Sequence, residues 1–352
     1  MKRRSFLKAT GAVAGSYALG LPPATAQDTA PAKRKKAADA PMPLRTLGRT
    51  GRKISVVGFP GLALSNYDQD EGTKGIHDAF ARGLNYFDVA PAYGRDGDCE
   101  KKMGIGLQGL DRSKYFLSCK TKMRDKQGSR KELERSLQRL KTDYFDLYQM
   151  HHIRFPDEVE RALGPGGALE TLLEAKKEGK VRHLGFSAHT TKGAVQLMKG
   201  FRFDTVMFPI NFVEFFKIGF GKAVLELAKE QGVAVLGMKT LSMGAWPRGA
   251  ERTRKWWYRT TETQQEVSLA LRFTLSQPGV ATGIPPSFLD LLDKAITAAK
   301  SYRPLRDRQN EKLRKVAESC LSVFEREEKL VALGLPPREP LYPDSPHECC
   351  HA

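Results

Sequence analysis

Short apolar runs rich in β-branched and aromatic residues alternate with amphipathic stretches along most of the chain. Eight runs predict strands, at 54–58, 84–88, 115–120, 145–151, 181–187, 205–210, 233–238 and 279–283. Between them, stretches such as 130–140 and 169–177 carry leucines at helical spacing. Strands that alternate with helices in this way favour a parallel sheet. We therefore predict an α/β fold, a (β/α)8 TIM barrel.

The alternative to a barrel is an open, doubly wound parallel sheet. That fold usually carries a G-x-G-x-x-G turn after its first strand, and Gly58 to Gly61 does not match this pattern. Residues 44–54 resemble a β-hairpin with turns at Gly48 and Gly51, which we place over the N-terminal end of the barrel. The charged stretch 303–333 predicts a helical C-terminal extension that packs outside the barrel; the alternative is that it forms a wall of the substrate pocket.

The first 26 residues have the composition of a targeting segment. Arg3 and Arg4 precede a weakly apolar, Ala- and Gly-rich stretch, and an A-x-A site ends at Ala26. This resembles a bacterial twin-arginine signal, which implies the twin-arginine export machinery as a partner and a periplasmic location. The stretch is too short and glycine-rich for stable membrane insertion. We divide the rest into a flexible linker (27–41), the barrel (42–300) and a C-terminal extension and tail (301–352).

The net charge of +18 raises the question of a polyanionic partner. Part of that charge lies in the leader and in the run Lys33 to Lys36, and most of the remainder interleaves with acidic residues on helical stretches. We therefore expect no nucleic-acid partner. The tail from His347 to His351 contains Cys349 and Cys350, but their spacing is not that of a chelating C-x-x-C pair, so we expect no metal site.

Four residues whose side chains could take part in catalysis fall at or just beyond the ends of successive predicted strands. Asp88 ends the second strand and Tyr93 follows it, Lys120 ends the third, and His151 ends the fourth. Each has an ordinary structural explanation alone, but a barrel brings its strand ends together at one mouth. Lys122 is an alternative to Lys120. The neighbouring His152 would point to the opposite side if the strand continues regularly.

The four residues suit the reduction of a carbonyl, because hydride addition creates an alkoxide that must be protonated. Tyr93 would donate the proton. A tyrosine has a pKa of about 10, and a nearby ammonium lowers it, which is the role we assign to Lys120. Asp88 would keep Lys120 charged and oriented. His151 would hydrogen-bond the substrate oxygen.

These motifs resemble those of the aldo-keto reductases. Residues 83–94, GLNYFDVAPAYG, resemble the family's first signature, and residues 117–121 and 143–151 resemble its next two strands. Residues 179–187 and 270–280 match later strands. The resemblance implies an NAD(P)H-dependent oxidoreductase that interconverts aldehydes or ketones and alcohols, with a small-molecule carbonyl or alcohol as substrate.

The resemblance also implies that NADP or NAD binds extended across the barrel mouth. The positions that match its cofactor contacts are Ser187, Ala188, Met207, Met238, Lys239, Thr240, Leu241, Pro285, Pro286 and Ser287. Several differ from the family pattern: Ala188 and Met207 replace polar carboxamide contacts, and Met238 replaces a stacking tyrosine. Relatives often place a cation at the 2′-phosphate, where this loop has Pro286 and Asp290; the nearest cation in sequence is Lys294.

Two classes of function remain open on the sequence. The first is an exported carbonyl reductase or alcohol dehydrogenase. The second is an exported barrel that binds nicotinamide nucleotide as a sensor or regulatory subunit. Because free nucleotide is scarce outside the cytoplasm, we also expect an exported enzyme to retain its cofactor, with the loop 246–258 closing over it.

Overall fold

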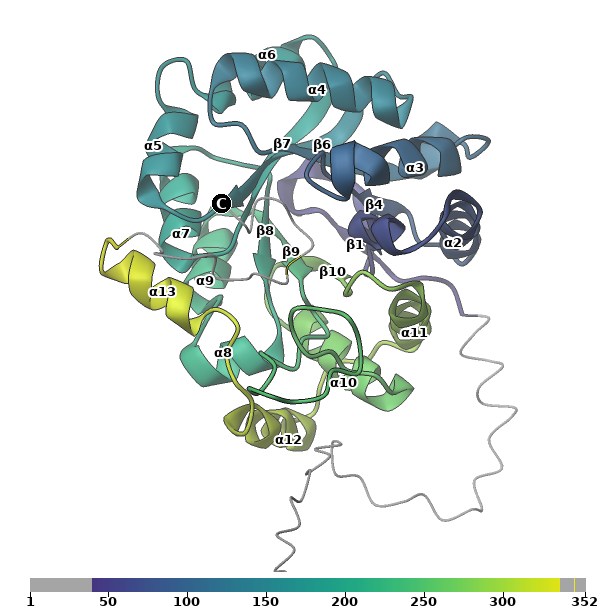
Figure 1. The fold of residues 1–352 in the computed structure, drawn as a ribbon, viewed down its shortest axis with the longest axis vertical. Helices are drawn as coiled ribbons and strands as arrows, with labels where there is room; N and C mark the ends of the chain where they lie inside the picture. The colour runs from purple at the N-terminus through teal and green to yellow at the C-terminus, as the bar shows by residue number, and fades with distance from the viewer. Residues whose placement is uncertain (1–39, 336–344, 346–352) are drawn as a thin grey trace, which may run out of the picture.

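The computed structural model describes residues 40–335 and residue 345. Its main feature is a sheet in which each strand pairs in parallel with the next along the chain (Figure 1). The strands are β3 Phe59–Pro60, β4 Tyr86–Asp88, β5 Phe116–Thr121, β6 Phe145–Ile153, β7 Val181–Ala188, β8 Thr205–Pro209, β9 Ala234–Met238 and β10 Val280–Ile284. A parallel bridge between Val57 and Gly283 closes the sheet. The predicted (β/α)8 barrel is confirmed.

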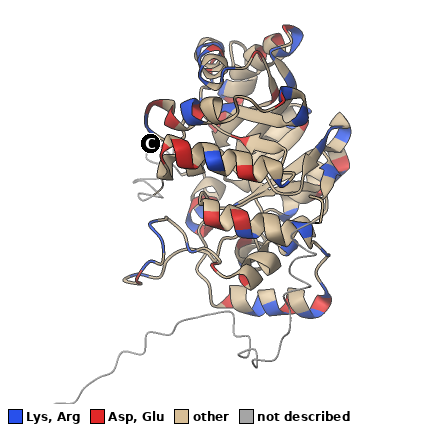
Figure 2. Cartoon of the chain, turned by 90° about the vertical axis from the view of Figure 1, so that its right-hand side faces the viewer, with Lys and Arg blue, Asp and Glu red and all other residues tan. Residues whose placement is uncertain are grey.

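Helices surround the barrel because each buries one apolar face against the strands. In α4, for example, Leu133, Leu137 and Leu140 are buried, as their spacing predicts. Acidic and basic residues interleave on the outer faces of these helices (Figure 2). The helices between and after the strands are α2 Gln69–Ala81, α3 Asp98–Gly106, α4 Lys126–Leu140, α5 Pro156–Leu163, α6 Ala168–Lys177, α7 Thr191–Gly200, α8 Phe212–Ile218, α9 Lys222–Gln231, α10 Gln264–Leu275 and α11 Leu289–Lys300.

The first barrel strand lies later than predicted. Strand β2, Lys53–Ser55, pairs antiparallel with β1, Leu44–Thr46, so the predicted strand 54–58 is split between the hairpin and the barrel. The barrel strand proper begins near Val57 and continues into β3. A single apolar run covers both elements because the hairpin pairing and the barrel pairing select the same residue types.

The hairpin occupies the predicted position at the N-terminal end of the barrel. Leu47 and Ile54 are fully buried and belong to the same apolar cluster as Tyr86 and Leu236, whose side chains fill the barrel interior. The turn needs a glycine at position 48, where φ is +48° and a Cβ would lie 2.9 Å from the backbone nitrogen of Ala234. The hairpin thus closes the end of the barrel opposite the strand ends that carry Asp88 and His151.

Up to residue 335, the C-terminal extension contains two helices, α12 Asp307–Glu318 and α13 Glu325–Ala332, where the sequence pattern predicted one. Helix α12 packs against α8, and α13 packs against α7. Between them, Phe324 stacks on Phe220 with ring centroids 5.0 Å apart and lies 5.7 Å from the ring of His189, beyond the end of β7. The helices therefore pack outside the barrel, as expected, but their junction reaches its mouth.

None of the helices in residues 40–335 is both long enough and apolar enough to cross a membrane. The predicted leader, nearly all of the predicted linker and the His/Cys tail lie outside the described residues.

Candidate active site

Asp88 and Lys120 form a buried ion pair between neighbouring strands β4 and β5. The Lys120 ammonium donates to Oδ2 of Asp88 at 2.5 Å and to the carbonyl oxygen of Val89 at 3.2 Å. Lys120 is fully buried and Asp88 is 3% exposed. Burial raises the pKa of the Asp88 carboxyl above its ordinary value, while the charge of Lys120 opposes this rise. Each charge therefore depends on the other for its stability inside the protein.

Tyr93 lies within hydrogen-bond distance of the same ammonium. The distance from Lys120 Nζ to the phenolic oxygen is 3.2 Å, and the ammonium is 4.8 Å from the ring centroid. Tyr93 comes from the loop after β4, and its amide donates to the carbonyl oxygen of Ala90 in a tight turn. The structure thus brings together Asp88, Tyr93 and Lys120, as the sequence predicted, with Lys120 and not Lys122 in contact with the tyrosine.

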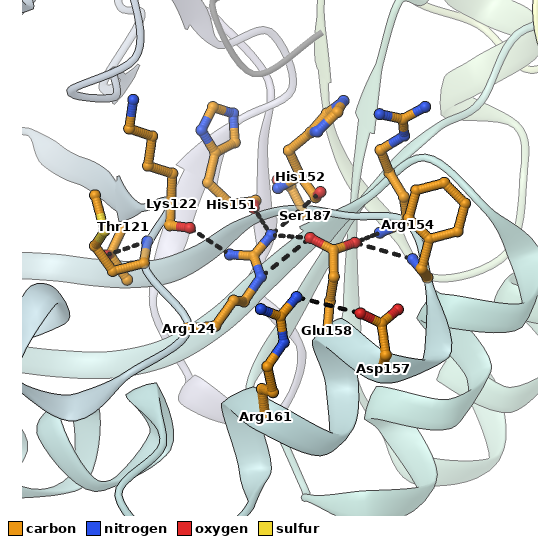
Figure 3. A network of polar contacts seen from close by, with 12 residues as sticks. Thr121, Lys122, Arg124, His151, His152, Arg154, Asp157, Glu158, Arg161 and Ser187 are labelled. Atoms are coloured by element: carbon orange, nitrogen blue, oxygen red, sulfur yellow. Dashed lines mark hydrogen bonds and ion pairs between the residues drawn. The ribbon is translucent and has the colours of Figure 1, made fainter. Parts of the chain in front are cut away.

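His151 lies beside this group near the end of β6. Its ring meets the Tyr93 ring edge-on, with centroids 5.5 Å apart. The Arg124 guanidinium donates to the carbonyl oxygen of His151 at 2.8 Å and also pairs with Glu158 (Figure 3). Glu158 in turn accepts the backbone N–H groups of Arg154 and Phe155. This network fixes the backbone that carries His151.

His152 does not point away from His151, so the expected regular alternation is wrong. The pairing of β6 with β7 shifts register between Met150 and Ile153, and His152 has φ +60°. A bulge of this kind turns successive side chains toward one side. Figure 3 shows Lys122, His151, His152 and Arg154 pointing in the same general direction, away from Glu158.

A cavity at the mouth contains most of the predicted cofactor positions. Asp88 and Tyr93 line it together with six of them: Met207, Met238, Lys239, Pro285, Pro286 and Ser287. These residues come from β8, β9 and the loop after β10, across the mouth from the ion pair. The arrangement offers a continuous path from the tyrosine to the last barrel strand.

The other four predicted positions are buried but do not line this cavity. The Ser187 hydroxyl accepts the amide of His152 at 2.8 Å, and Thr240 Oγ1 donates to the carbonyl oxygen of Ile284 at 3.3 Å. Ala188 and Leu241 are fully buried. In this structure Ser187 and Thr240 therefore connect strand ends.

The loop after β9 covers one side of the cavity. Trp256, Trp257 and Tyr258 line it and are at most 8% exposed. The preceding Arg254 makes two hydrogen bonds to Asp290 in the first turn of α11, at 3.0 and 2.6 Å, and also pairs with Glu262. Lys294 is 3.2 Å from Asp290 as well. Two cations, and not Lys294 alone, therefore stand at the loop where the 2′-phosphate was expected.

Sequence reasoning missed Arg254 and His189 near the mouth. It also missed Pro60 to Leu62, which line the cavity. Arg254 lies 36 positions before Asp290, so no local spacing signals their contact. His189 directly follows the predicted Ser187 and Ala188 pair, and that adjacency was the available signal. Pro60 follows from the strand register, because it pairs with Asp88.

The fold and site define a parallel α/β barrel with a buried Asp–Lys–Tyr group at the C-terminal ends of its strands. A model of the aldo/keto reductase family matches residues 57–318. The chain belongs to that family.

Curated relatives agree with this assignment, and a solved structure agrees with the fold. L-galactose dehydrogenase of Arabidopsis thaliana is 36% identical over 159 residues, which cover 41% of this chain and 48% of the relative. An uncharacterized oxidoreductase of Bacillus subtilis, YqkF, is 31% identical over 41% of this chain and 48% of its own length. The matched segments thus span about half of these relatives. An aldo-keto reductase from Bacillus halodurans, solved in its holo form, superposes with TM-score 0.66 and 23% identity, over 82% of this chain and 99% of its own.

The network behind His151 makes a pH-dependent contribution to stability. Burial acts to raise the pKa of Glu158, but Arg124 and the two backbone N–H groups prevail and lower it below its ordinary 4.5. We expect Glu158→Gln to lower the free energy of unfolding by about 1–3 kcal/mol at pH 7. A carboxyl group whose pKa is lower in the folded state than in the unfolded state stabilises the folded protein at pH values above the unfolded-state pKa. The loss should therefore be full above about pH 5 and shrink as the pH falls through the folded-state pKa of Glu158.

The matched control is Asp157→Asn on the same helix. Asp157 pairs with Arg161 at the surface, and its side chain is 68% exposed, so its loss should cost less than about 0.5 kcal/mol. Urea unfolding of both variants between pH 3 and 7 measures the difference. Equal effects, or an effect of Glu158→Gln that does not change with pH, would contradict this account.

Proposed function

We propose that this protein is a nicotinamide-dependent carbonyl reductase that acts on aldehydes or ketones and can run in reverse as an alcohol dehydrogenase. The observation that carries the proposal is the contact of the buried Lys120 ammonium with both Asp88 and the Tyr93 hydroxyl, at the wall of a cavity. Family membership and relatives named as dehydrogenases or reductases support it.

The residues divide the chemistry between them. Tyr93 donates the proton that the developing alkoxide needs, and the adjacent positive charge of Lys120 stabilises the phenolate that remains. Asp88 orients Lys120 and balances its charge. His151, edge-on to Tyr93, orients the substrate oxygen toward the phenol.

The cavity suits a nicotinamide nucleotide, which when bound would supply or accept the hydride. Met207, Met238 and Trp257 offer polarizable and aromatic surface for a flat ring, and Pro285 to Ser287 extend the lining toward α11. The proposal covers both NADP and NAD, because Asp290 and its two cations, Arg254 and Lys294, stand together at the far end of this path.

We further propose, from the leader sequence, that the protein is exported by the twin-arginine pathway to the periplasm with its nucleotide already bound. The pairing of Arg254 with Glu262 and Asp290 supports retention, because it ties the loop carrying Trp256 and Trp257 to the start of α11. A ligand under such a loop leaves only after these contacts break.

The proton donor is tested by Tyr93→Phe. We expect turnover of aldehydes with NADPH or NADH to fall about 100-fold or more, because the phenol acts mainly in the transition state. Nucleotide affinity, measured by quenching of tryptophan fluorescence, should stay close to that of the wild type. The control is Tyr115→Phe, another buried tyrosine outside the cavity. If Tyr93→Phe keeps its turnover, or the wild type binds nucleotide but reduces no carbonyl, the sensor function is favoured.

Retention is tested by Arg254→Gln. Protein purified from the periplasm without added nucleotide should release NAD(P) on denaturation. In stopped-flow displacement, the variant should release nucleotide about tenfold faster or more, because the loop is no longer tied to Asp290 and Glu262. Arg248→Gln, an exposed arginine in the same loop, is the control. Nucleotide-free wild-type protein, or equal release rates, would overturn the retention proposal.

A further inference from the structure

The two neighbours of Lys120 in β5 contact buried carboxylates on the outer side of the barrel. Side chains alternate along a strand, so Cys119 and Thr121 lie on the opposite face of β5 from Lys120. The Cys119 thiol donates to Oε1 of Glu100, in α3, at 3.5 Å. The Thr121 hydroxyl donates to Oε2 of Glu132, in α4, at 2.7 Å. Lys120 is therefore flanked on both sides by residues that the helices hold.

Glu132 fixes the chain where β5 ends. Its Oε2 also accepts the backbone N–H of Lys122 at 2.9 Å, so one oxygen holds a side chain and an amide of consecutive residues. The Thr121 hydroxyl oxygen in turn accepts the N–H of Met123 at 3.2 Å. Glu132 is 2% exposed and Thr121 is fully buried. Hydrogen bonds to a carboxylate are stronger where water is excluded, so the strand end that follows Lys120 is held firmly.

Glu100 connects β5 with the loop that carries Tyr93. It lies in the first turn of α3, and the amide of the preceding residue, Cys99, donates to the carbonyl oxygen of Tyr93 at 3.4 Å. Through α3, the Glu100 carboxylate thus connects the chain of the proton donor with the strand of Lys120. The distance of 3.2 Å between the Lys120 ammonium and the Tyr93 hydroxyl is spanned by this connection.

Burial of these two carboxylates needs compensation, and α4 supplies it. Arg139 pairs with Oε2 of Glu100 at 3.0 Å. Arg135 pairs with Oε1 of Glu132 at 3.3 Å. Arg139 can approach only because residue 97 is glycine, since a Cβ there would lie 2.0 Å from its Nη1 atom. Apolar side chains could fill the space between helix and sheet without this desolvation cost, so the carboxylates favour a role in setting geometry.

We propose that Glu100 and Glu132 are positioning residues, which set the distance between the Lys120 ammonium and the Tyr93 hydroxyl. This inference rests on the proposed reductase function and adds the residues on which the alignment of its proton donor depends. Asp88 holds the ammonium from within the barrel, and the two glutamates hold the chain on either side of Lys120 from outside it. A displacement of about 1 Å at a reacting group can lower a rate about 100-fold.

The test compares Glu132→Ala with Glu132→Gln. The alanine variant leaves the Thr121 hydroxyl and the Lys122 amide without their acceptor. We expect kcat for aldehyde reduction to fall about tenfold, with KM and nucleotide affinity within about twofold of the wild type. The alkaline limit of kcat should move to higher pH, because an ammonium held less closely lowers the Tyr93 pKa less. Glu132→Gln keeps an acceptor oxygen and should restore most of the rate and of the pH limit.

Glu100→Gln removes the ion pair with Arg139 and should change kcat and the alkaline limit in the same direction as Glu132→Ala. The matched control is Glu134→Ala, on the same helix. Glu134 pairs with Lys180 at 2.7 Å and its side chain is 40% exposed, so its loss should change neither quantity. Thermal melting checks that each variant is folded. A loss of stability alone lowers the folded fraction but leaves the pH limit of the folded enzyme where it was.

The outcomes separate this inference from the function on which it rests. An alkaline limit that stays at the wild-type pH in Glu132→Ala or in Glu100→Gln overturns the positioning role and leaves the reductase standing. If Glu132→Ala does not fold, Thr121→Val, which removes the donor and keeps the shape, takes its place with the same expectation. If the wild type reduces no carbonyl, the reductase proposal fails. Carbon NMR of tyrosine labelled at the ζ carbon then decides the positioning role: a higher Tyr93 pKa in the Glu132 variant supports it, and an equal pKa overturns it.

Discussion

The arrangement of the site depends on one ion pair, between Asp88 and Lys120. Two opposite charges this deeply buried are stable only together, because either alone would lose its hydration without compensation. The pairing is possible because β4 and β5 are neighbours in the barrel, with Asp88 opposite Ser118, two residues from Lys120. Once Lys120 is fixed by Asp88 and by the carbonyl oxygen of Val89, its remaining hydrogen-bonding capacity faces Tyr93.

The rest of the mouth is built around this fixed point from more distant parts of the chain. Arg124 and Glu158 hold the backbone at the end of β6, and the bulge there turns both His151 and His152 to one side. The C-terminal extension reaches the same region through Phe324, and Arg254 ties the loop after β9 to α11. The hairpin closes the N-terminal end of the barrel and therefore does not cover the mouth.

The sequence predicted the barrel and the proximity of Asp88, Tyr93 and Lys120 for physical reasons that differ from those behind its wrong predictions. Strands β5 to β10 follow from apolar runs, and Asp88, Tyr93 and Lys120 follow from the rule that parallel strand ends share one mouth. The position of the first barrel strand was wrong because one apolar run serves both hairpin and barrel. Regular alternation gave the wrong side for His152 because a bulge leaves no periodic signature. Arg254 meets Asp290, 36 positions later, only through a tertiary contact, so local spacing could not assign it a role.

The central claim is that the charge of Lys120, held by Asp88, sets the acidity of the proton donor. The most direct measurement is the pH dependence of kcat/KM for aldehyde reduction in the wild type and in the double variant Asp88→Asn/Lys120→Met, which removes both charges and leaves none unpaired. Without the ammonium, the donor should keep its proton to higher pH but give it up less readily. We predict an alkaline limit displaced upward, with a rate lower by about 100-fold or more at neutral pH. A profile and rate equal to those of the wild type would contradict the account.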